Sequence, residues 1–448
     1  MLLSVNNIRK TINYCKKNGF KEGYYAISER ISQRKNKYDY DEVEAEVLEK
    51  QAEKTFPLMP KISVLVPAYE TKEIFIEDLI LSLEDQSYTN FELIIADASE
   101  TDKVKNKVED LNSQYGNIHY YRLDENKGIS ENSNKALQYV TGEYVALLDH
   151  DDVLTPDALY EVVNMINKNK DAVLIYSDED KGSEYLDTFY EPNIKSTFNK
   201  DMLLSNNYIC HLSVYKSEVL KSLGFRPEYD GAQDFDLILR TLLYVEKEFG
   251  EDKVKDYIVH IPKVLYHWRC HESSTAANPE SKNYAYDAGL RAVQSYLKEK
   301  EVAAKVCHSK HLGFYYVDYE DDIFSKRKDI GVVGGPVIKN HKVSGGAMDA
   351  KGKILFEGLN EHFAGYLNRA VIQQQVQAVD VRNMKIRGDL KSLFEKTFGF
   401  EYKDIDKNIS ENTSKDKNQE LMKKSLIFCN KVRNKGISIL YDPNLKEQ

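Results

Sequence analysis

The chain has 448 residues, and 42% of them are hydrophobic and 30% charged, a balance that excludes a disordered chain. Its formal net charge of -10 argues against nucleic acid or an anionic membrane as the main partner. The length predicts two or three structural units. The chain contains no apolar run of about 18 residues and no signal-peptide core, so we expect a cytoplasmic protein without a transmembrane segment. Attachment to the inner membrane face stays open. The five scattered cysteines are predicted to be reduced thiols.

Residues 1–58 are predicted to form a helical segment. Ile8, Ile12 and Cys15 recur at helical spacing until Gly19, and further helical stretches are expected at 21–34 and 41–54. Prolines at 57 and 60 end this pattern. We interpret the segment as a helical hairpin packed on the main domain, with a helix that docks on a membrane surface or a partner as the alternative.

Residues 59–305 show the pattern of an α/β domain. Helices are expected near 73–86, 101–115 and 130–140, between four apolar, β-rich runs: Ile62–Val66, Phe91–Ala96, Ile118–Leu123 and Tyr144–Leu148. Strands that alternate with helices predict a parallel sheet with helices on both faces. Ligands bind beyond the carboxyl ends of such strands, and conspicuous polar residues follow the first, second and fourth runs.

An acidic loop, Asp149-His150-Asp151-Asp152, follows the fourth run. Three carboxylates in four residues repel one another unless a cation or solvent intervenes. Carboxylate oxygens suit hard divalent ions, so the loop predicts a Mn²⁺ or Mg²⁺ site that also grips a diphosphate. The alternative is an acidic turn before a helix that starts with Thr155 and Pro156 as N-cap and first helical residue.

Two later segments could complete such a site. Apolar residues after Gln233 predict a helix with Asp234 in its first turn, where it could act as a general base. Simple complementarity to the helix dipole is the alternative. In the segment around His267 and Arg269, the imidazole could bind metal and the guanidinium could pair with phosphate, although a structural histidine would show the same pattern.

Together, these segments resemble the family 2 glycosyltransferases of GT-A fold, in particular the bacterial branch that builds rhamnan-type and other surface polysaccharides. The resemblance covers about residues 60–300, and it is carried by ISVLVPAYET, FELIIADASETD, ENKGISENSNKALQYVTGEYVALLDHDDVLTPDAL, LIYSDEDK, SNNYICHLSVYKSEVLKSLGFRPEYDGAQDFDLILR and PKVLYHWRCHESSTA. It implies a Rossmann-like nucleotide-diphospho-sugar transferase domain, preceded by N-terminal helices and followed by a smaller C-terminal α/β domain.

The resemblance also implies roles for individual residues. Asp234 would be the catalytic base, and Asp151 and His267 would contact the metal. Asp97 would accept a hydrogen bond from the base's ring N–H, which favours uracil or thymine. The remaining expected nucleotide-sugar contacts are Pro67, Tyr69, Glu70, Lys127, Gly128, Ser130, Asp149, His150 and Arg269. Two departures from many relatives, Gln233 in place of Glu and Ala98 in place of Asp, leave the donor open.

The expected function is metal-dependent, inverting sugar transfer from a UDP- or dTDP-sugar to a hydroxyl of a glycan, a lipid-linked glycan or a protein. Residues 306–448 show no DxD or base motif and are predicted to form a degenerate, non-catalytic domain that binds acceptor or mediates self-association as a homo-oligomer. The alternatives are a catalytically decayed carbohydrate- or nucleotide-binding scaffold and a sugar nucleotidyltransferase. The donor sugar, the acceptor and the linkage are not fixed by these patterns.

Overall fold

The computed structural model describes residues 14–16, 18–33, 38–112, 117–271, 283–320, 322–405 and 415–445. The chain divides into two compact units. The larger unit holds residues 38–198 and 207–300, and the smaller unit holds 1–37, 199–206 and 301–448. This division differs from the three predicted segments, because 1–37 belongs with the C-terminal residues and 199–206 is contributed from the middle of the chain.

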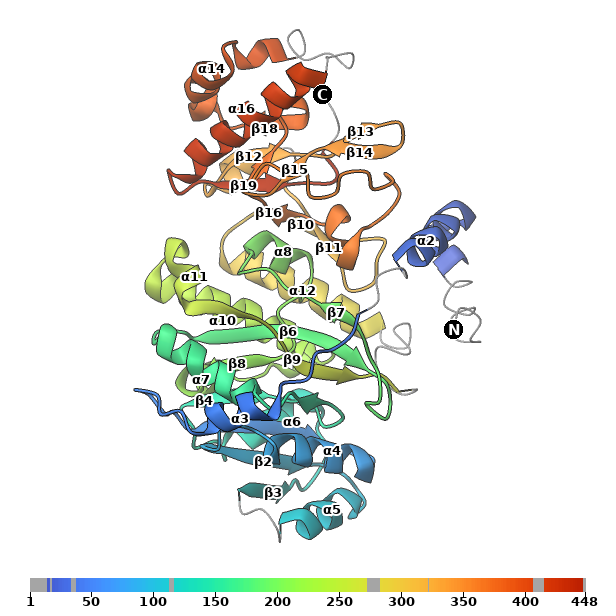
Figure 1. Cartoon of the computed structure of the whole chain (residues 1–448), viewed down its shortest axis with the longest axis vertical. Coiled ribbons are helices and arrows are strands. Elements are labelled where there is room, and N and C mark those ends of the chain that lie inside the picture. Colours follow the sequence, from blue (N-terminus) through green and yellow to red (C-terminus); the bar gives the residue numbers. More distant parts are fainter. Residues whose placement is uncertain are drawn as a thin grey trace. The chain divides into compact units, whose positions relative to one another are not determined.

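A nine-stranded mixed sheet forms the centre of the larger unit (Figure 1). The strand order is β3-β2-β1-β4-β8-β6-β9-β5, with β7 paired to β6. The first four strands in this order are parallel, as the sequence predicts. The strands are β1 Ile62–Ala68, β2 Phe91–Asp97, β3 Ile118–Arg122, β4 Tyr144–Leu147, β5 Val153–Leu154, β6 Leu174–Gly182, β7 Phe189–Asn193, β8 Ser213–Lys216 and β9 Ile258–Arg269.

Helices α4, α5 and α6 connect the first four strands near the predicted positions, and the larger unit contains further helices. The helices are α3 Ala45–Ala52, α4 Glu73–Glu84, α5 Lys103–Asn112, α6 Ile129–Leu137, α7 Ala158–Lys168, α9 Ser217–Leu223, α10 Gln233–Phe249, α11 Val254–Tyr257 and α12 Asn283–Glu299, with short 3-10 turns η1 Pro227–Tyr229 and η2 Glu251–Lys253. Helix α7 starts later than expected, with Asp157 at the N-cap. The Thr155 hydroxyl donates to the Asp157 carboxylate at 2.8 Å instead of capping a helix itself.

The core of the larger unit lies on the central strands. Nearly every residue of β1 and β2 is buried, as expected for parallel strands covered on both faces. Apolar side chains of α4 and α7 pack into the same cluster, among them Ile76, Leu79 and Val163. This packing holds the carboxyl ends of β1, β2 and β4 at one edge, so their loops share that edge.

The smaller unit has its own sheet, β16-β19-β12-β18, in which β12 and β19 are parallel. Phe394, Phe398 and Phe428 pack with one another in its core. Its strands are β10 Lys305–His308, β11 Tyr315–Asp318, β12 Ile330–Gly334, β13 Val337–Lys339, β14 Lys342–Gly345, β15 Ala347–Met348, β16 Gln374–Gln375, β17 Ala378–Val379, β18 Met384–Ile386 and β19 Ser438–Tyr441.

Helices complete the smaller unit: α2 Phe20–Gln33, α8 Lys200–Ser205, α13 Ile323–Lys326, α14 Lys391–Phe398 and α16 Lys415–Arg433, with 3-10 turns η4 Tyr366–Val371, η5 Val381–Asn383, η6 Gly388–Leu390 and η7 Tyr402–Asp404. The predicted helical spacing of Ile8 and Ile12 lies outside the described residues. Over the described part of the chain, no helix combines the length and the apolar character needed to cross a bilayer.

Candidate active site

The acidic loop Asp149–Asp152 follows β4 directly, at the carboxyl edge of the parallel strands. Asp152 is completely buried. Its carboxylate accepts a hydrogen bond from the backbone N–H of Arg269 at 2.7 Å and another from the Tyr266 hydroxyl. Burial raises the pKa of Asp152 well above its usual range, and the charges of Asp151 and Asp149 add to this shift. Asp152 therefore supports the loop, which leaves Asp149 and Asp151 to face a ligand.

Arg269 supports this loop through hydrogen bonds to backbone carbonyls. Its side chain is completely buried, and its guanidinium donates to the backbone carbonyls of Asp151 and Glu184 at 2.6 and 2.7 Å. It also pairs with Asp78 at 3.0 Å and lies over the Phe75 ring at 4.5 Å from the centroid. These contacts give Arg269 a positioning role. Its Nη2 atom forms the ion pair with Asp78 but has no hydrogen bond among the described residues, and the predicted phosphate contact stays a prediction.

The histidine beside Asp151 is His271. Its Nε2 lies 2.8 Å from the Asp151 carboxylate. The Asp151 side chain is 20% exposed. The predicted partner, His267, lies within β9 and is buried. Its Nδ1 lies 2.5 Å from the Asp180 carboxylate, and its ring stacks on Phe189 at 4.0 Å between centroids. The structure therefore does not bring His267 to Asp151.

Asp234 lies in the first turn of α10, as predicted, and is partly exposed. One carboxylate oxygen accepts a hydrogen bond from the Asn207 side-chain amide at 2.9 Å. Burial raises the pKa of Asp149, His211 opposes the rise, and the charges of Asp151 and Asp234 add to it. Asp234, from a distant part of the chain, is therefore one of the charged groups that act on Asp149.

Some buried polar atoms at this edge lack a hydrogen-bond partner among the described residues. Besides Nη2 of Arg269, they include Nδ1 of His150, in the acidic loop, and Oδ1 of Asn207, whose amide holds Asp234. Buried polar atoms are nearly always paired in folded proteins. A ligand bound between the loop and α10 would supply the partners of His150 and Asn207.

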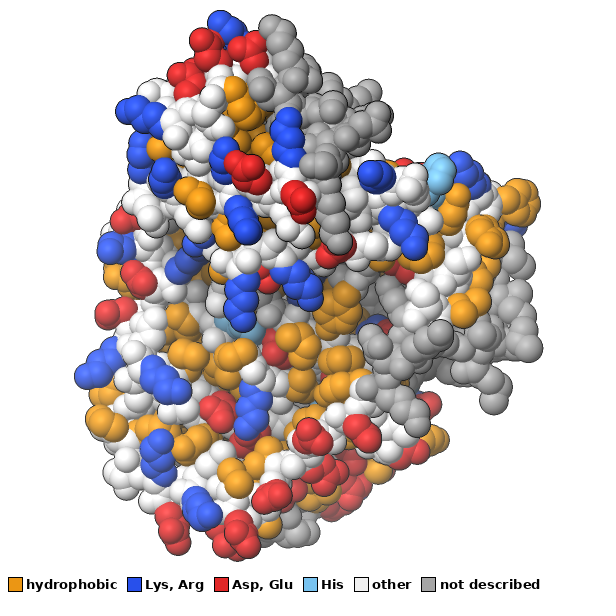
Figure 2. All heavy atoms as spheres, turned by 45° about the horizontal axis from the view of Figure 1, so that its top comes forward, with side chains coloured by type: hydrophobic (Ala, Val, Ile, Leu, Met, Phe, Trp, Pro, Cys, Tyr) orange, Lys and Arg blue, Asp and Glu red, His pale blue; other side chains and the backbone are white. Residues whose placement is uncertain are grey.

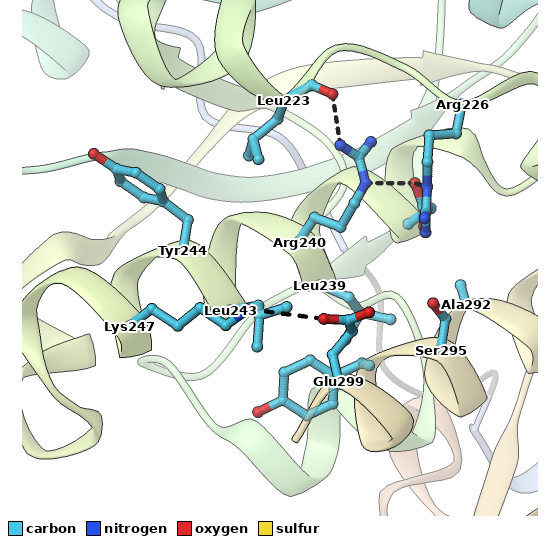
Figure 3. Close-up of a pocket in the computed structure, with 12 residues that line it drawn as sticks. Leu223, Arg226, Leu239, Arg240, Leu243, Tyr244, Lys247, Ala292, Ser295 and Glu299 are labelled. Carbon is cyan, nitrogen blue, oxygen red and sulfur yellow. Dashed lines mark hydrogen bonds and ion pairs between the residues drawn. The ribbon is translucent and has the colours of Figure 1, made fainter. Parts of the chain in front are cut away.

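Asp236, two residues after Asp234, points to the other side of α10. It is 1% exposed and is bound by the Arg226 and Arg240 guanidiniums, the latter at 2.8 Å. On this side, residues of α10 and α12 line a cavity of about 310 Å³ (Figure 3). Its lining includes Asp236 and Tyr244 but not Asp234. The two aspartates therefore belong to different surroundings, one of them a structural ion pair.

The ends of β1 and β2 are joined by Ser99. Its hydroxyl donates to the Asp97 carboxylate and accepts from the backbone N–H of Glu70 at 2.7 Å. The Glu70 side chain accepts from the backbone N–H groups of Glu100 and Thr101. The structure thus brings these two predicted pocket residues together.

Asp97 itself does not face open space. It is completely buried, and its second oxygen accepts from the Tyr120 hydroxyl at 2.7 Å. In this conformation the carboxylate holds the pocket wall, whereas the prediction gave it direct contact with the nucleotide base. Pro67 lies within β1, and Tyr69, which follows that strand, is 44% exposed.

The predicted nucleotide contacts at the start of α6 lie next to Asp230, in the segment before α10. Gly128 has a φ of +95°, and a Cβ there would lie 2.6 Å from the Asp230 carboxylate. The backbone N–H of Ser130 donates to the same carboxylate at 3.3 Å. Lys127 is exposed and pairs with Glu125 at 2.7 Å. Asp230 therefore ties the start of α6 to the loop that leads to Asp234.

The predicted metal site requires side chains that can coordinate a divalent ion. Across the described ranges, no three His, Cys, Asp or Glu side chains converge as a preformed metal cage. Mg²⁺ sites that handle phosphates commonly use one or two carboxylates and take the other ligands from substrate and water. His271 and Asp151, which are 2.8 Å apart in a hydrogen-bond contact, are the two candidate donors beside the loop. One carboxylate with one imidazole matches a site of this kind, in which a diphosphate and water would supply the remaining ligands.

The sequence patterns did not identify three residues of this site, although all three lie in the stretches that carry the family resemblance. They are His271, Asn207 and His211, whose ring stacks on Tyr266 at 4.8 Å between centroids. Only His271 had a local signal, since it follows the end of a strand, where functional side chains gather.

Comparison with known proteins finds a family match over part of the larger unit. Residues 63–224, which include the acidic loop, match the model of the family described as Glycosyl transferase family 2. The match and the mixed sheet agree with the predicted α/β fold of GT-A type.

Relatives cover a similar part of the chain. An uncharacterized protein of Sinorhizobium fredii is 39% identical over 53% of this chain and 25% of its own length. An O-antigen biosynthesis protein of Myxococcus xanthus is 27% identical over 55% and 19%, respectively. A Campylobacter jejuni GalNAc(5)-diNAcBac-PP-undecaprenol beta-1,3-glucosyltransferase is 29% identical over 43% and 62%. The chain thus spans a quarter or less of the first two relatives.

Two solved structures show a distant likeness. The Staphylococcus aureus TarS fragment in complex with UDP is 20% identical, over 53% of this chain and 65% of that one, with a TM-score of 0.39. A mannosyltransferase of Pyrobaculum calidifontis in complex with GDP-Man and Mn²⁺ is 16% identical, over 65% and 87%, with a TM-score of 0.38.

Proposed function

We propose that this chain is a glycosyltransferase that moves a sugar from a UDP- or dTDP-sugar to a hydroxyl of a surface glycan, a lipid-linked glycan or a protein, in the cytoplasm. The observation that carries the proposal is the acidic loop at the carboxyl edge of the sheet, with Asp234 among the charges that act on Asp149. The family 2 domain at residues 63–224 supports the same reaction class. The names of the Myxococcus and Campylobacter relatives favour a glycan acceptor.

In the proposed mechanism, Asp234 accepts the proton of the acceptor hydroxyl while the hydroxyl oxygen attacks the anomeric carbon. The bond from that carbon to the diphosphate oxygen breaks on the opposite face, so the configuration inverts. The Asn207 amide and the Cys210 thiol both hydrogen-bond the Asp234 carboxylate, so these two side chains would orient the base toward the acceptor hydroxyl. One positioned base without a second carboxylate in a nucleophile role is the arrangement of a single displacement, unlike the paired carboxylates of retaining glycosidases.

The leaving diphosphate would lie at Asp149 and Asp151. A Mg²⁺ or Mn²⁺ held there by Asp151 and His271 would neutralise charge on the diphosphate. Arg269 and Asp152 hold the loop in position for this contact. The partly exposed Tyr69 and the start of α6 would face the nucleoside, with Asp97 behind them.

The test combines a donor panel with a matched pair of variants. The full chain is incubated with nucleotide sugars and candidate acceptors, and diphosphate release and transfer are measured. Asp234→Asn should bind donor normally but lower kcat by roughly 100- to 10,000-fold. Asp236→Asn should keep turnover in the folded fraction but lower the free energy of unfolding by about 2–4 kcal/mol, because two arginines lose their partner. The lower part of that range applies if solvent screens Arg226, whose side chain is 32% exposed.

Three outcomes would overturn this proposal. Near wild-type transfer by Asp234→Asn would place the base elsewhere. Release of pyrophosphate in place of a nucleoside diphosphate would identify a sugar nucleotidyltransferase. Tight nucleotide binding without turnover of any donor would identify a decayed binding scaffold.

A further inference from the structure

Helix α2 carries an exposed apolar stripe. Phe20, Tyr24, Ile27 and Ile31 are 88%, 67%, 38% and 51% exposed. Their spacing of four, three and four residues places all four side chains within an arc of about 60° on the helix. Single exposed apolar residues are ordinary, whereas a continuous stripe of them indicates an interaction surface.

The opposite face of α2 is anchored within the smaller unit. Glu22 pairs with Lys310 at 2.9 Å. The Glu29 carboxylate accepts from the backbone N–H groups of Ala364 and Gly365 at 2.9 and 2.7 Å. Tyr25, on the same side, stacks on His362 with ring centroids 4.1 Å apart. These contacts determine which face of the helix is free, and they turn both of its acidic side chains away from that face.

Basic side chains flank the stripe. Lys21 and Arg30 are exposed, and helical geometry places them about 90° to either side of its centre. The surrounding sequence has the same sign, since residues 1–37 contain nine Lys and Arg but two Asp and Glu, in a chain whose net charge is -10. In Figure 2, hydrophobic side chains gather beside Lys and Arg on the part of the surface that holds α2.

We propose that α2 is an interfacial anchor that lies flat on an anionic lipid bilayer, with Phe20, Tyr24, Ile27 and Ile31 in the headgroup region and Lys21 and Arg30 on lipid phosphates. An aromatic and aliphatic stripe between basic flanks is the pattern of helices that lie in the membrane plane. With 14 residues, the helix is too short to span a bilayer. A second copy of α2 is disfavoured because its basic flanks would meet like charges. This surface is independent of the proposed sugar transfer.

The experiment measures binding of the full chain to vesicles by flotation, using phosphatidylcholine alone and phosphatidylcholine mixed with phosphatidylglycerol. The matched variants are Ile31→Asp, in the stripe, and Ile427→Asp, on α16. The two isoleucines are 51% and 48% exposed, so they lose similar exposed apolar surface. A second pair, Lys21→Glu and Lys423→Glu, tests charge in the same way. Circular dichroism melting curves check that each variant is folded.

We expect wild type to bind the anionic vesicles and not the neutral ones. Ile31→Asp should weaken the binding at least about tenfold, as expected for excluding one large aliphatic side chain from the interface, and Lys21→Glu should weaken it severalfold. Ile427→Asp and Lys423→Glu should bind like wild type. The proposal is overturned if wild type binds neither vesicle, if it binds both equally, or if each variant behaves like its control. A dimer that Ile31→Asp dissociates, without vesicle binding, would also overturn it.

Discussion

Replacing Arg269 by methionine separates a positioning role from direct phosphate binding. The methionine side chain fills similar space but provides none of the donors that now hold the backbone carbonyls of Asp151 and Glu184. It also removes the ion pair with Asp78 and the cation over Phe75. The acidic loop would then be held by the Asp152 contacts, by His271 at Asp151 and by the Tyr266 hydroxyl at the Asp149 backbone.

The cost can be worked from these contacts. Hydrogen bonds to a charged donor contribute about 1.5–3 kcal/mol each, and a buried cation over an aromatic ring adds about 1–2 kcal/mol. The terms are not additive, because removing the guanidinium also removes the cost of burying it. Breaking a buried pair by deleting one partner typically costs 3–5 kcal/mol. We therefore expect Arg269→Met to lower the free energy of unfolding by about 3–5 kcal/mol.

The assay is urea unfolding of the full chain, together with calorimetric titration of UDP in the presence of Mn²⁺. We expect the loss of stability to be accompanied by weaker UDP binding, since the loop that carries Asp151 loses its support. Arg269→Lys should recover part of the stability, because it keeps a charge near Asp78. If Arg269→Met unfolds within about 1 kcal/mol of wild type yet binds UDP at least tenfold more weakly, the arginine contacts the diphosphate directly and our reasoning fails.

Two further predictions concern metal binding and acid stability. Chelation should abolish transfer and Mn²⁺ should restore it. His271→Ala should weaken Mn²⁺-dependent UDP binding at least about tenfold, whereas His267→Ala should mainly lower the melting temperature; full activity in excess chelator would refute the metal site. Burial alone would raise the pKa of Glu92, but hydrogen bonds from Lys61, Ser63 and Thr141 lower it from 4.5 to about 2. Its stabilisation, about 3 kcal/mol, is complete above pH 4.5 and lost as the pH falls towards 2. Glu92→Gln should thus be less stable near neutrality and lose less stability on acidification, and equal acid sensitivity in urea unfolding would contradict this.

Much of the larger unit followed from local sequence patterns. Alternating apolar runs and helical stretches predicted the parallel strands β1 to β4 and their helices, because each pattern depends on residues close in the chain. Helical geometry separates Asp234 and Asp236 by about 200° around α10, and in the structure Asp236 belongs to a buried ion pair while Asp234 contacts Asn207. The acidic loop was found because its position follows from the end of a strand.

Which distant side chains meet that loop was decided by tertiary structure. The sequence by itself indicated that imidazole and guanidinium groups lie on or near β9, but either histidine could have been the partner of Asp151. The register pairs His267 with Val153 of β5 and Asp180 of β6, which buries it, and His271 reaches Asp151 only beyond the strand end. Arg269 is buried for the same reason. The sequence determined the elements and their chemistry through short-range periodicity, whereas the pairing of segments 87 to 120 residues apart decided which groups form the site.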